Sequence, residues 1–253
     1  MPNDNRSSAL AKALSVLDAV CNQPQAVGLP DLAAQLGLPR QTVHRVLGQL
    51  ETMKLVVRDR SRERYYVGPR LSKLAFGALS TLNQSAPIRS ILQDLVDDIG
   101  ETCNIGVLHD LDYVHLQRIE CQWPLRLNHD AGTRMPAHAV PGGKVLLAYL
   151  APAVSRRLLK TRKLKAATPR TLTRVTDLET EFARIRAAGF ALNNQERMDG
   201  VVGAAVPVFD PAGTVLTAVG MHGPLPRLTV KACERHAPRL QQAAERIARA
   251  WYD

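Results

Sequence analysis

One stretch near the N-terminus restricts the fold of this chain most, because it predicts two short helices joined by a turn of three residues. The first helix is expected over 31–36, where Asp31 can cap the N-terminus or favour the helix dipole. The sequence Gly37-Leu-Pro39 predicts the turn, since glycine takes a positive φ easily and proline readily starts a helix. The second helix is expected over 40–53, and the segment therefore predicts a helix-turn-helix.

The second of these helices has two chemically different faces. At about 100° per residue its apolar side chains fall within one narrow arc, which must face the core. This arc consists of Val43, Val46, Leu47 and Leu50. The other side offers groups that bind base edges and phosphates: Arg40, Gln41, Thr42, His44 and Arg45. A merely solvated helix would carry Glu–Lys pairs there, but no acid precedes Glu51, so the face predicts a DNA recognition helix.

A helix and a hairpin complete the expected DNA-binding domain. The helix runs from Ala9 to Val20, with Leu10 and Leu14 on its apolar face. After the recognition helix, the β-prone runs 55–58 and 65–67 flank a polar tip and predict a hairpin. Its basic side chains can reach phosphates or the minor groove: Arg60, Arg62 and Arg64. Any one of these arginines could be idle, but the order of the elements is far more specific than its parts and predicts a winged helix-turn-helix.

The distribution of charge agrees with this interpretation. The 253 residues carry a formal net charge of +10. Residues 40–73 hold nine Lys or Arg against three acids, a net of +6, whereas the other 219 residues hold 24 basic and 20 acidic side chains. Such a cationic block is expected where a protein binds phosphates. A solvated basic surface remains an alternative that charge alone does not exclude.

Helices mixed with hairpins over the rest of the chain predict an antiparallel α+β domain. An amphipathic helix after Pro69 is expected to link it to the winged domain. The domain limits follow: 1–69 for the winged helix-turn-helix, 70–84 for the linker helix and 85–253 for the second domain. This second domain is expected to begin with a helix over 88–99, closed by Gly100.

The expected strands of this domain form two hairpins, with turn residues at 110–112 and 210–213. The paired strands are 102–109 with 113–119, and 204–209 with 214–221. Residues 125–129 could add a further strand.

Some local features carry expectations of their own. The sequence Thr176-Asp-Leu-Glu179 matches a capping box and should begin a helix. Pro238 should kink or divide the C-terminal helix. Cys21 and Cys233 lie at apolar positions of predicted helices and are expected to be buried. The four cysteines include no CxxC pair, and a disulfide framework is not expected.

Several motifs, taken in order, resemble the IclR family of bacterial transcription regulators. The resemblance rests on Leu29–Leu47, Tyr65–Leu71, Gly132–Lys144 and Gly200–Pro224, and so covers nearly the whole chain. It implies that 85–253 is a GAF-like domain binding a small organic acid as effector. It also implies that dimers pair into tetramers through these domains. A homodimer joined through the first helix and the linker helix would place two recognition helices in successive major grooves of double-stranded operator DNA.

A loop that leads into an apolar helix marks the expected effector site. Gly142 and Gly143 lie at the first turn of that helix, where unpaired N–H groups and the dipole favour an anion. A loop that needs glycine only for its backbone conformation is an equally good explanation. Pro141 removes one potential N–H donor. The sequence is no phosphate-binding Walker loop, because Lys144 is followed by valine and not by Ser or Thr.

The family resemblance implies further pocket residues on later segments. Polar contacts match Asn193, Gly203, Gly220 and His222, and pocket walls match Leu127, Met135 and Val201. This chain departs from the keto-acid pattern, in which these polar positions hold an acid, a cysteine and two serines. The two glycines predict a larger pocket and therefore a bulkier acid, such as an aromatic one. His222 could pair with the carboxylate of the acid, or could be a hydrogen-bonded core histidine.

Two other classes of function are weaker alternatives. An enzyme could use Cys103, His109 and Asp110, but Cys103 and His109 would lie about 20 Å apart at opposite ends of one strand. A non-specific nucleic-acid binder would need exposed aromatic side chains, and aromatic residues make up only 4% of the chain. The sequence therefore favours a transcription regulator that is not an enzyme.

No cofactor and no metal ion are expected. The histidines show no recognised metal-binding spacing: His109, His115, His129 and His138. No stretch reaches the apolar length of a membrane span, and the N-terminus lacks the apolar run of a secretory signal. A cytoplasmic protein is expected.

Overall fold

Two structural units divide the chain, Met1–Thr81 and Leu82–Asp253. The computed structural model describes residues 8–23, 25–59, 63–82, 86–124, 127 and 133–252. Each unit has its own hydrophobic core, and the expected α+β class is confirmed. The chain divides inside a helix, and the expected domain limits at 69 and 84 stay predictions.

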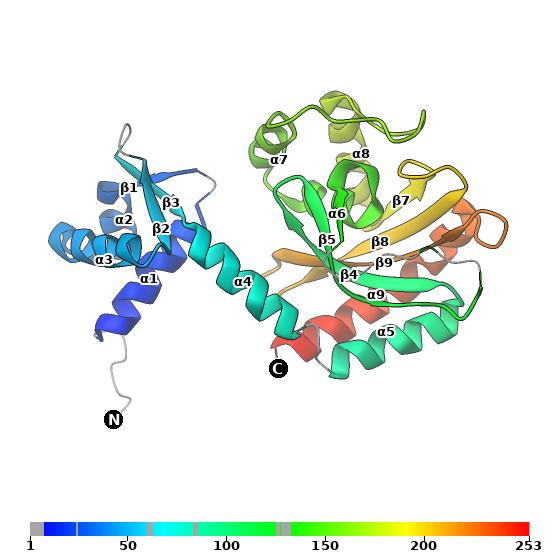
Figure 1. Ribbon diagram of the computed structural model, residues 1–253, viewed down its shortest axis with the longest axis horizontal. Helices are drawn as coiled ribbons and strands as arrows, with labels where there is room; N and C mark the ends of the chain where they lie inside the picture. Colours follow the sequence, from blue (N-terminus) through cyan, green and yellow to red (C-terminus); the bar gives the residue numbers. More distant parts are fainter. Residues whose placement is uncertain are drawn as a thin grey trace. The chain divides into compact units, whose positions relative to one another are not determined.

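The N-terminal unit is a three-helix cluster with a small antiparallel sheet, followed by a fourth helix (Figure 1). Its elements are α1 (Ala9–Cys21), β1 (Val27–Gly28), α2 (Leu29–Leu36), α3 (Arg40–Thr52), β2 (Val56–Asp59), β3 (Arg64–Val67) and α4 (Pro69–Leu82). The sheet has the order β1-β3-β2, so the expected hairpin gains a third strand. The strand β1 could not be predicted from the sequence, because two residues show no periodicity.

The helix-turn-helix forms as the sequence predicts. Gly37 ends α2 in the left-handed conformation, with φ 63°, and so allows the tight turn before α3. The expected inner face of α3 is buried in the core: Val43, Val46, Leu47 and Leu50. Since α2 begins at Leu29, Asp31 lies in its first turn, where it favours the dipole but does not cap the helix.

The apolar face of α1 is only partly used in the core. Val16, Ala19 and Val20 are buried, but Leu10 and Leu14 are 70% and 51% exposed. The expectation that Cys21 is buried was wrong, because this last residue of α1 extends past the core contact and is exposed.

The second unit is a six-stranded antiparallel sheet between two layers of helices (Figure 1). Its strands are β4 (Thr102–His109), β5 (Asp112–Ile119), β6 (Arg134–Pro136), β7 (Ala191–Asn194), β8 (Val201–Phe209) and β9 (Val215–Pro224), in the order β6-β5-β4-β9-β8-β7. Its helices are α5 (Ala86–Ile99), α6 (Pro141–Tyr149), α7 (Pro152–Leu159), α8 (Val175–Ala188) and α9 (Val230–Tyr252), and a short 3-10 helix covers Ala137–Ala139. Helices α5 and α9 pack together on one face of the sheet, and α6 with α8 on the other.

Both predicted hairpins of this unit are present, but the edges of the sheet differ from expectation. The central strands β4, β5, β8 and β9 pair in the expected order. The edge strands β6 and β7 have three and four residues, too few to show a strand pattern in the sequence. The further strand expected over 125–129 lies outside the described residues, except Leu127.

The predicted start of one helix and the predicted division of another were wrong. Helix α8 begins with Arg174 as its N-cap and has no side-chain cap, so Thr176 lies inside the first turn and forms no capping box. Helix α9 continues through Pro238, so the expected division into two helices was wrong, and the kink stays a prediction. Proline removes one helix hydrogen bond, while the buried neighbours Ala237 and Leu240 hold both halves against the core. Cys233 in the same helix is buried as predicted.

Candidate functional site

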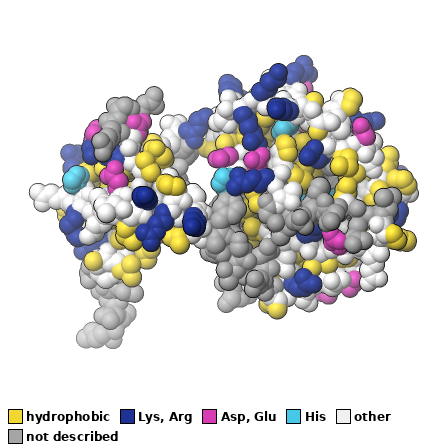
Figure 2. Space-filling view, in the orientation of Figure 1, with side chains coloured by type: hydrophobic (Ala, Val, Ile, Leu, Met, Phe, Trp, Pro, Cys, Tyr) yellow, Lys and Arg dark blue, Asp and Glu magenta, His cyan; other side chains and the backbone are white. Residues whose placement is uncertain are grey.

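The outward face of α3 is accessible. Arg40, Gln41, His44 and Arg45 are exposed, and Thr42 is half-buried. A Cβ added at Gly48 would meet no atom within 4 Å, so the helix surface is open at this position. Figure 2 shows Lys, Arg and His side chains on this side of the N-terminal unit. The face therefore combines a cationic surface with room for a close approach.

The arginines of the expected wing differ in their surroundings. Arg64 is exposed at the start of β3, but its Nη1 donates to the carbonyl oxygen of Ala26 at 3.0 Å. Arg58 forms an ion pair with Glu63, and its guanidinium lies 5.9 Å from the ring centroid of Tyr65. Arg64 and Arg58 thus brace the hairpin. The predicted DNA contacts Arg60 and Arg62 lie outside the described residues.

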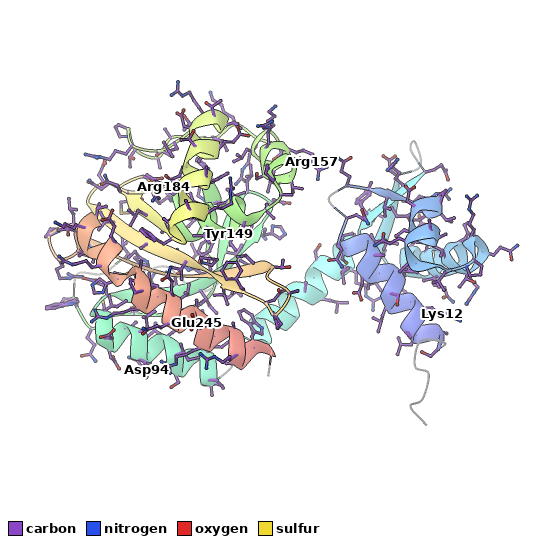
Figure 3. All side chains as sticks on the ribbon, turned by 180° about the vertical axis from the view of Figure 1, so that it is seen from behind. Lys12, Asp94, Tyr149, Arg157, Arg184 and Glu245 are labelled. Carbon is purple, nitrogen blue, oxygen red and sulfur yellow. The ribbon has the colours of Figure 1, made fainter. Side chains whose placement is uncertain are left out.

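A cavity of about 70 Å³ lies in the second unit, bounded by the sheet and the first turn of α6. Figure 3 shows the second unit from behind, with Tyr149 of α6 and Arg184 of α8 on one side of the sheet and Asp94 of α5 and Glu245 of α9 on the other. The lining residues are Asn104, Tyr113, His115, Leu127, Met135, Val140, Pro141, Gly142, Asn193, Arg197, Met198, Val201, Gly220, Met221 and His222. The volume is below the roughly 150 Å³ of an apolar cavity that binds benzene.

Most of the expected effector residues meet at this cavity. Those that line it are Leu127, Met135, Gly142, Asn193, Val201, Gly220 and His222. Gly203 does not line it, and a Cβ there would lie 2.5 Å from the carbonyl oxygen of Met221. Gly143 does not line it either, because it packs against the backbone of Ala137, 2.3 Å from a Cβ position. The expectation that Gly203 enlarges the pocket was therefore wrong.

The glycines at the start of α6 are required by close packing and not by backbone conformation. Neither Gly142 nor Gly143 has a positive φ. A Cβ on Gly142 would lie 2.6 Å from the ring of Tyr113, so only glycine lets the helix approach the sheet here. The first hydrogen bond of the helix starts at the N–H of Lys144, which leaves the N–H of Gly142 without a partner in the helix.

A polar row crosses the otherwise apolar cavity. The hydroxyl of Tyr113 donates to Oδ1 of Asn104 at 3.0 Å, and Nδ2 of Asn104 lies 3.4 Å from Nδ1 of His222. The ring of His115 packs edge-on against Tyr113, with centroids 5.3 Å apart. Burial raises the pKa of Tyr113 above its ordinary value, so its phenol is neutral.

Sequence reasoning missed part of the lining because strand alternation alone does not tell which face is covered. Asn104 and Gly220 are direct partners in β4 and β9, although they are far apart in the chain. Their shared face becomes evident only from the sheet order. The residues missed are Asn104, Tyr113, His115, Val140, Arg197, Met198 and Met221.

Next to the cavity, Lys144 is buried in an ion cluster. Its side chain is 1% exposed, and Nζ lies 2.7 Å from Oε1 of Glu196 and 3.2 Å from Oε1 of Glu181. Burial raises the pKa of Glu181, but hydrogen bonds and charges from Arg184 and Lys144 leave that pKa below its ordinary value. The cluster joins α6, α8 and the segment after β7.

The structure does not bring together the residues considered for an enzyme. Cys103 and His109 stand at opposite ends of β4, and Asp110 follows directly beside His109. Burial raises the pKa of the Cys103 thiol, which disfavours the reactive thiolate.

Of the histidines considered as metal ligands, His138 has one ring nitrogen, Nε2, 3.1 Å from the carbonyl oxygen of Lys165. Burial lowers the pKa of His138. His129 lies outside the described residues. In the part of the chain that the structure describes, no group of three or more His, Cys, Asp or Glu side chains could hold a metal ion. No helix in this part is long and apolar enough to cross a membrane.

Sequence similarity to known proteins extends over both units. Residues 9–60 match the profile of the IclR helix-turn-helix domain, and residues 76–249 match that of the bacterial transcriptional regulator IclR C-terminal domain. The chain is 34% identical to the protein named probable transcriptional regulator SauR of Cupriavidus necator, over 98% of this chain and 99% of that protein.

Two solved structures resemble the fold. The IclR protein of Thermotoga maritima aligns with a TM-score of 0.60 and 26% identity, over 95% of this chain and 97% of that one. The inducer-binding domain of a PobR double mutant from Acinetobacter, in complex with 3-hydroxybenzoic acid, aligns with a TM-score of 0.57 and 27% identity. That alignment covers 63% of this chain and 94% of the other.

Proposed function

The chain belongs to the IclR family of bacterial transcriptional regulators, and from this membership we propose that a small organic acid in the cavity of the second unit changes its affinity for operator DNA. The observation that carries the proposal is the separation of two sites on one chain. An exposed cationic helix face lies in the first unit, and a mostly apolar cavity lies in the second. Two distinct sites with one chain between them are what allosteric control requires.

On the DNA side, each residue of the α3 face has a chemical role. Arg45 and Gln41 carry the planar groups that form paired hydrogen bonds with guanine and adenine edges. Arg40 and Thr42, at the start of the helix, contact phosphates, and His44 lies between the two sets. Arg60, Arg62 and Arg64 of the hairpin reach the backbone or the minor groove beside them. No cofactor and no catalytic step enter this function.

On the effector side, the acid lies against the first turn of α6. The N–H of Gly142, which has no partner within the helix, and the helix dipole favour a negative charge there, whereas Pro141 has no N–H to donate. The relative from Acinetobacter was solved with an aromatic acid. For this chain the cavity of about 70 Å³ favours a smaller acid, and an aromatic ring would require an outward movement of Met198, which is 44% exposed.

The experiment that tests this function starts from a pool of random duplexes. The full-length protein should select a two-fold related sequence and protect it from cleavage in a footprint. A library of organic acids is then screened for compounds that raise the melting temperature and change the affinity for the selected duplex. Binding without sequence selection would instead favour a non-specific nucleic-acid protein. Turnover of a screened compound would favour the enzyme alternative.

We also propose that the protein is a dimer joined through α1 and α4, and that dimers pair through the second units. Leu10 and Leu14 form an exposed apolar edge on α1, and Leu74 on α4 is 53% exposed. Burial of a leucine contributes about 1.5–3 kcal/mol, so these side chains favour a partner over solvent. A regulator of this kind works in the bacterial cytoplasm, where the DNA is.

Replacing both Leu10 and Leu14 by glutamate should convert the dimer into monomers, because charges would then be buried at the interface. Sedimentation equilibrium should show the change in mass, and the affinity for the selected duplex should fall with the loss of the second half-site. The control is Ser15→Glu, which adds a charge at an exposed position of the same helix. A double variant that stays dimeric would place the interface elsewhere.

A further inference from the structure

The loop between β7 and β8 forms the side of the cavity that meets solvent. Arg197 and Met198 of this loop line the cavity; Arg197 is half-buried and Met198 is 44% exposed. The loop is tightly closed, since Gln195 and Gly200 at its ends have positive φ values of 60° and 76°. The side chain of Gln195 also accepts a hydrogen bond from the N–H of Gly200 at 3.0 Å.

The backbone before Arg197 is fixed by contacts to three separate segments. Glu196 forms its buried ion pair with Lys144 of α6, at 2.7 and 2.8 Å. The N–H of Glu196 donates to Oδ1 of Asn193 at 2.8 Å, and the carbonyl oxygen of Glu196 accepts from Oγ1 of Thr171 at 2.6 Å. Arg197 therefore starts from a rigid point, which lowers the entropy lost when its side chain binds a ligand.

The charges around the cavity are unbalanced. Among the described lining residues, Arg197 is the one Lys, Arg, Asp or Glu. The ion pairs of the described residues do not include Arg197, whereas its neighbour in the loop, Glu196, is paired with Lys144. The largely buried carboxylates beside the loop, Glu196 and Glu181, are thus paired with Lys144 and Arg184, and Asp199 near the end of the loop is exposed to solvent. The cationic group of Arg197 remains available to an anion.

We propose that Arg197 binds the anionic group of the effector together with the first turn of α6, and thereby selects small organic anions with an apolar body over their uncharged analogues. This inference rests on the proposed function and adds the group that recognises the negative charge of the ligand. The guanidinium can form two parallel hydrogen bonds with a carboxylate, which are stronger than bonds between neutral groups. The apolar body lies against Met135, Val140 and Val201, and the neutral row of Tyr113 and Asn104 offers hydrogen bonds to a second polar group.

The chemistry also predicts what the cavity rejects. An amide of the same shape as the acid would leave the guanidinium without its counter-charge, and an amine would be repelled by it. Arg197 lies outside the residues that family resemblance marks in this pocket, although it lines the cavity.

The test uses pairs of probes that differ only in charge: acetate with acetamide, butyrate with butyramide, and benzoate with benzamide. Titration calorimetry on the full-length protein should show that at least one acid binds more tightly than its amide. Arg197→Gln should weaken binding of that acid by about 10- to 100-fold, the range of a charge-assisted hydrogen bond, and leave the amide unchanged. Arg197→Lys should retain part of the preference, because it keeps the charge but loses the paired geometry.

The control is Arg235→Gln, which removes an exposed arginine of α9 outside the cavity lining and should leave all affinities unchanged. The proposal is overturned if no acid is preferred over its amide in the wild type, or if Arg197→Gln keeps the preference. Binding of the selected duplex by Arg197→Gln without ligand is measured alongside. Unchanged DNA binding with an unchanged acid preference would refute the role of Arg197 and leave the proposed regulator intact. If the wild-type protein shows no sequence-selective DNA binding, the proposed function as a regulator is refuted.

Discussion

Arg45→Ala should abolish selective binding to the operator while the protein stays folded. Arg45 is exposed on the middle of α3, on the side opposite the buried arc, so its loss leaves the core unchanged. A paired contact between a side chain and a base edge contributes about 1–3 kcal/mol of discrimination. A dimer uses the contact twice, and the expected loss is about 2–6 kcal/mol, or roughly 30-fold to more than 10⁴-fold in affinity.

The measurement compares the affinities of wild type and variant for the selected duplex and for a scrambled duplex. Arg89→Ala, an exposed arginine of α5, controls for the loss of one positive charge and should retain selectivity. Arg40→Ala provides a second comparison, because loss of a phosphate contact should weaken both duplexes about equally and reduce the salt dependence. If Arg45→Ala keeps the wild-type ratio of affinities for the operator and the scrambled duplex, α3 is not the recognition helix.

Lys144→Met should have the largest effect on stability. The side chain is 1% exposed and holds the carboxylates of Glu196 and Glu181, which are themselves largely buried. Removing one partner from a buried ion pair leaves an uncompensated charge and costs about 3–5 kcal/mol. For a unit of this size, the melting temperature should fall by roughly 10 °C or more.

The same cluster predicts a dependence on pH. The pKa of Glu181 in the fold is below its ordinary value, so Glu181 contributes stability at pH values above the ordinary carboxyl range. This contribution is lost as the pH falls through the lowered pKa. Thermal unfolding measured from neutral to acidic pH should therefore show a smaller slope for Lys144→Met than for wild type.

Two comparisons separate the loss of the charge pair from a general packing defect. The double variant Lys144→Met with Glu196→Gln should recover part of the lost stability, because it removes the charge that was left unpaired. Arg156→Met breaks the exposed pair between Arg156 and Glu179 in the same helical layer and should change stability little. If Lys144→Met melts within a few degrees of wild type, water or another cation must already compensate Glu196, since Glu181 keeps its pair with Arg184.

The DNA-binding unit could be predicted closely because its pattern is local. A period of 3.6 residues places Val43 and Leu47 inside and Arg45 outside without reference to any other segment. The conformation of Gly37 follows in the same way from the turn that it must make. The strand β1 could not be predicted, since Val27 and Gly28 become a strand only by pairing with Tyr65 and Arg64.

The cavity could be predicted only in part because it depends on contacts between distant segments. Family resemblance supplied Asn193 and His222, but the neighbours Asn104 and Tyr113 lie on strands whose order the sequence does not reveal. The effect of a glycine on the size of the cavity also depends on distant segments. Gly203 was expected to leave space, yet the carbonyl oxygen of Met221 lies only 2.5 Å from the position that a Cβ would take there.

Charge density alone would have been a misleading guide to the DNA interface. Residues 152–174 hold eight Lys or Arg and no acid, a denser block than residues 40–73. Figure 2 shows Lys and Arg side chains over this part of the second unit. Three of them form ion pairs with acids: Arg156 with Glu179, Arg162 with Asp112, and Arg174 with Asp177. What distinguishes α3 is the combination of an exposed helix face, groove-sized geometry and no acid before Glu51.

The cavity and the α3 face are expected to be coupled, and a linkage measurement is the sharpest test of this coupling. The affinity of the protein for its selected duplex is measured with and without a saturating effector, and the affinity for that effector with and without the duplex. Coupled sites must change each other by one common factor, expected at about 5- to 150-fold. A ligand that binds tightly in the cavity and leaves the affinity for DNA unchanged would show that the two sites are not coupled.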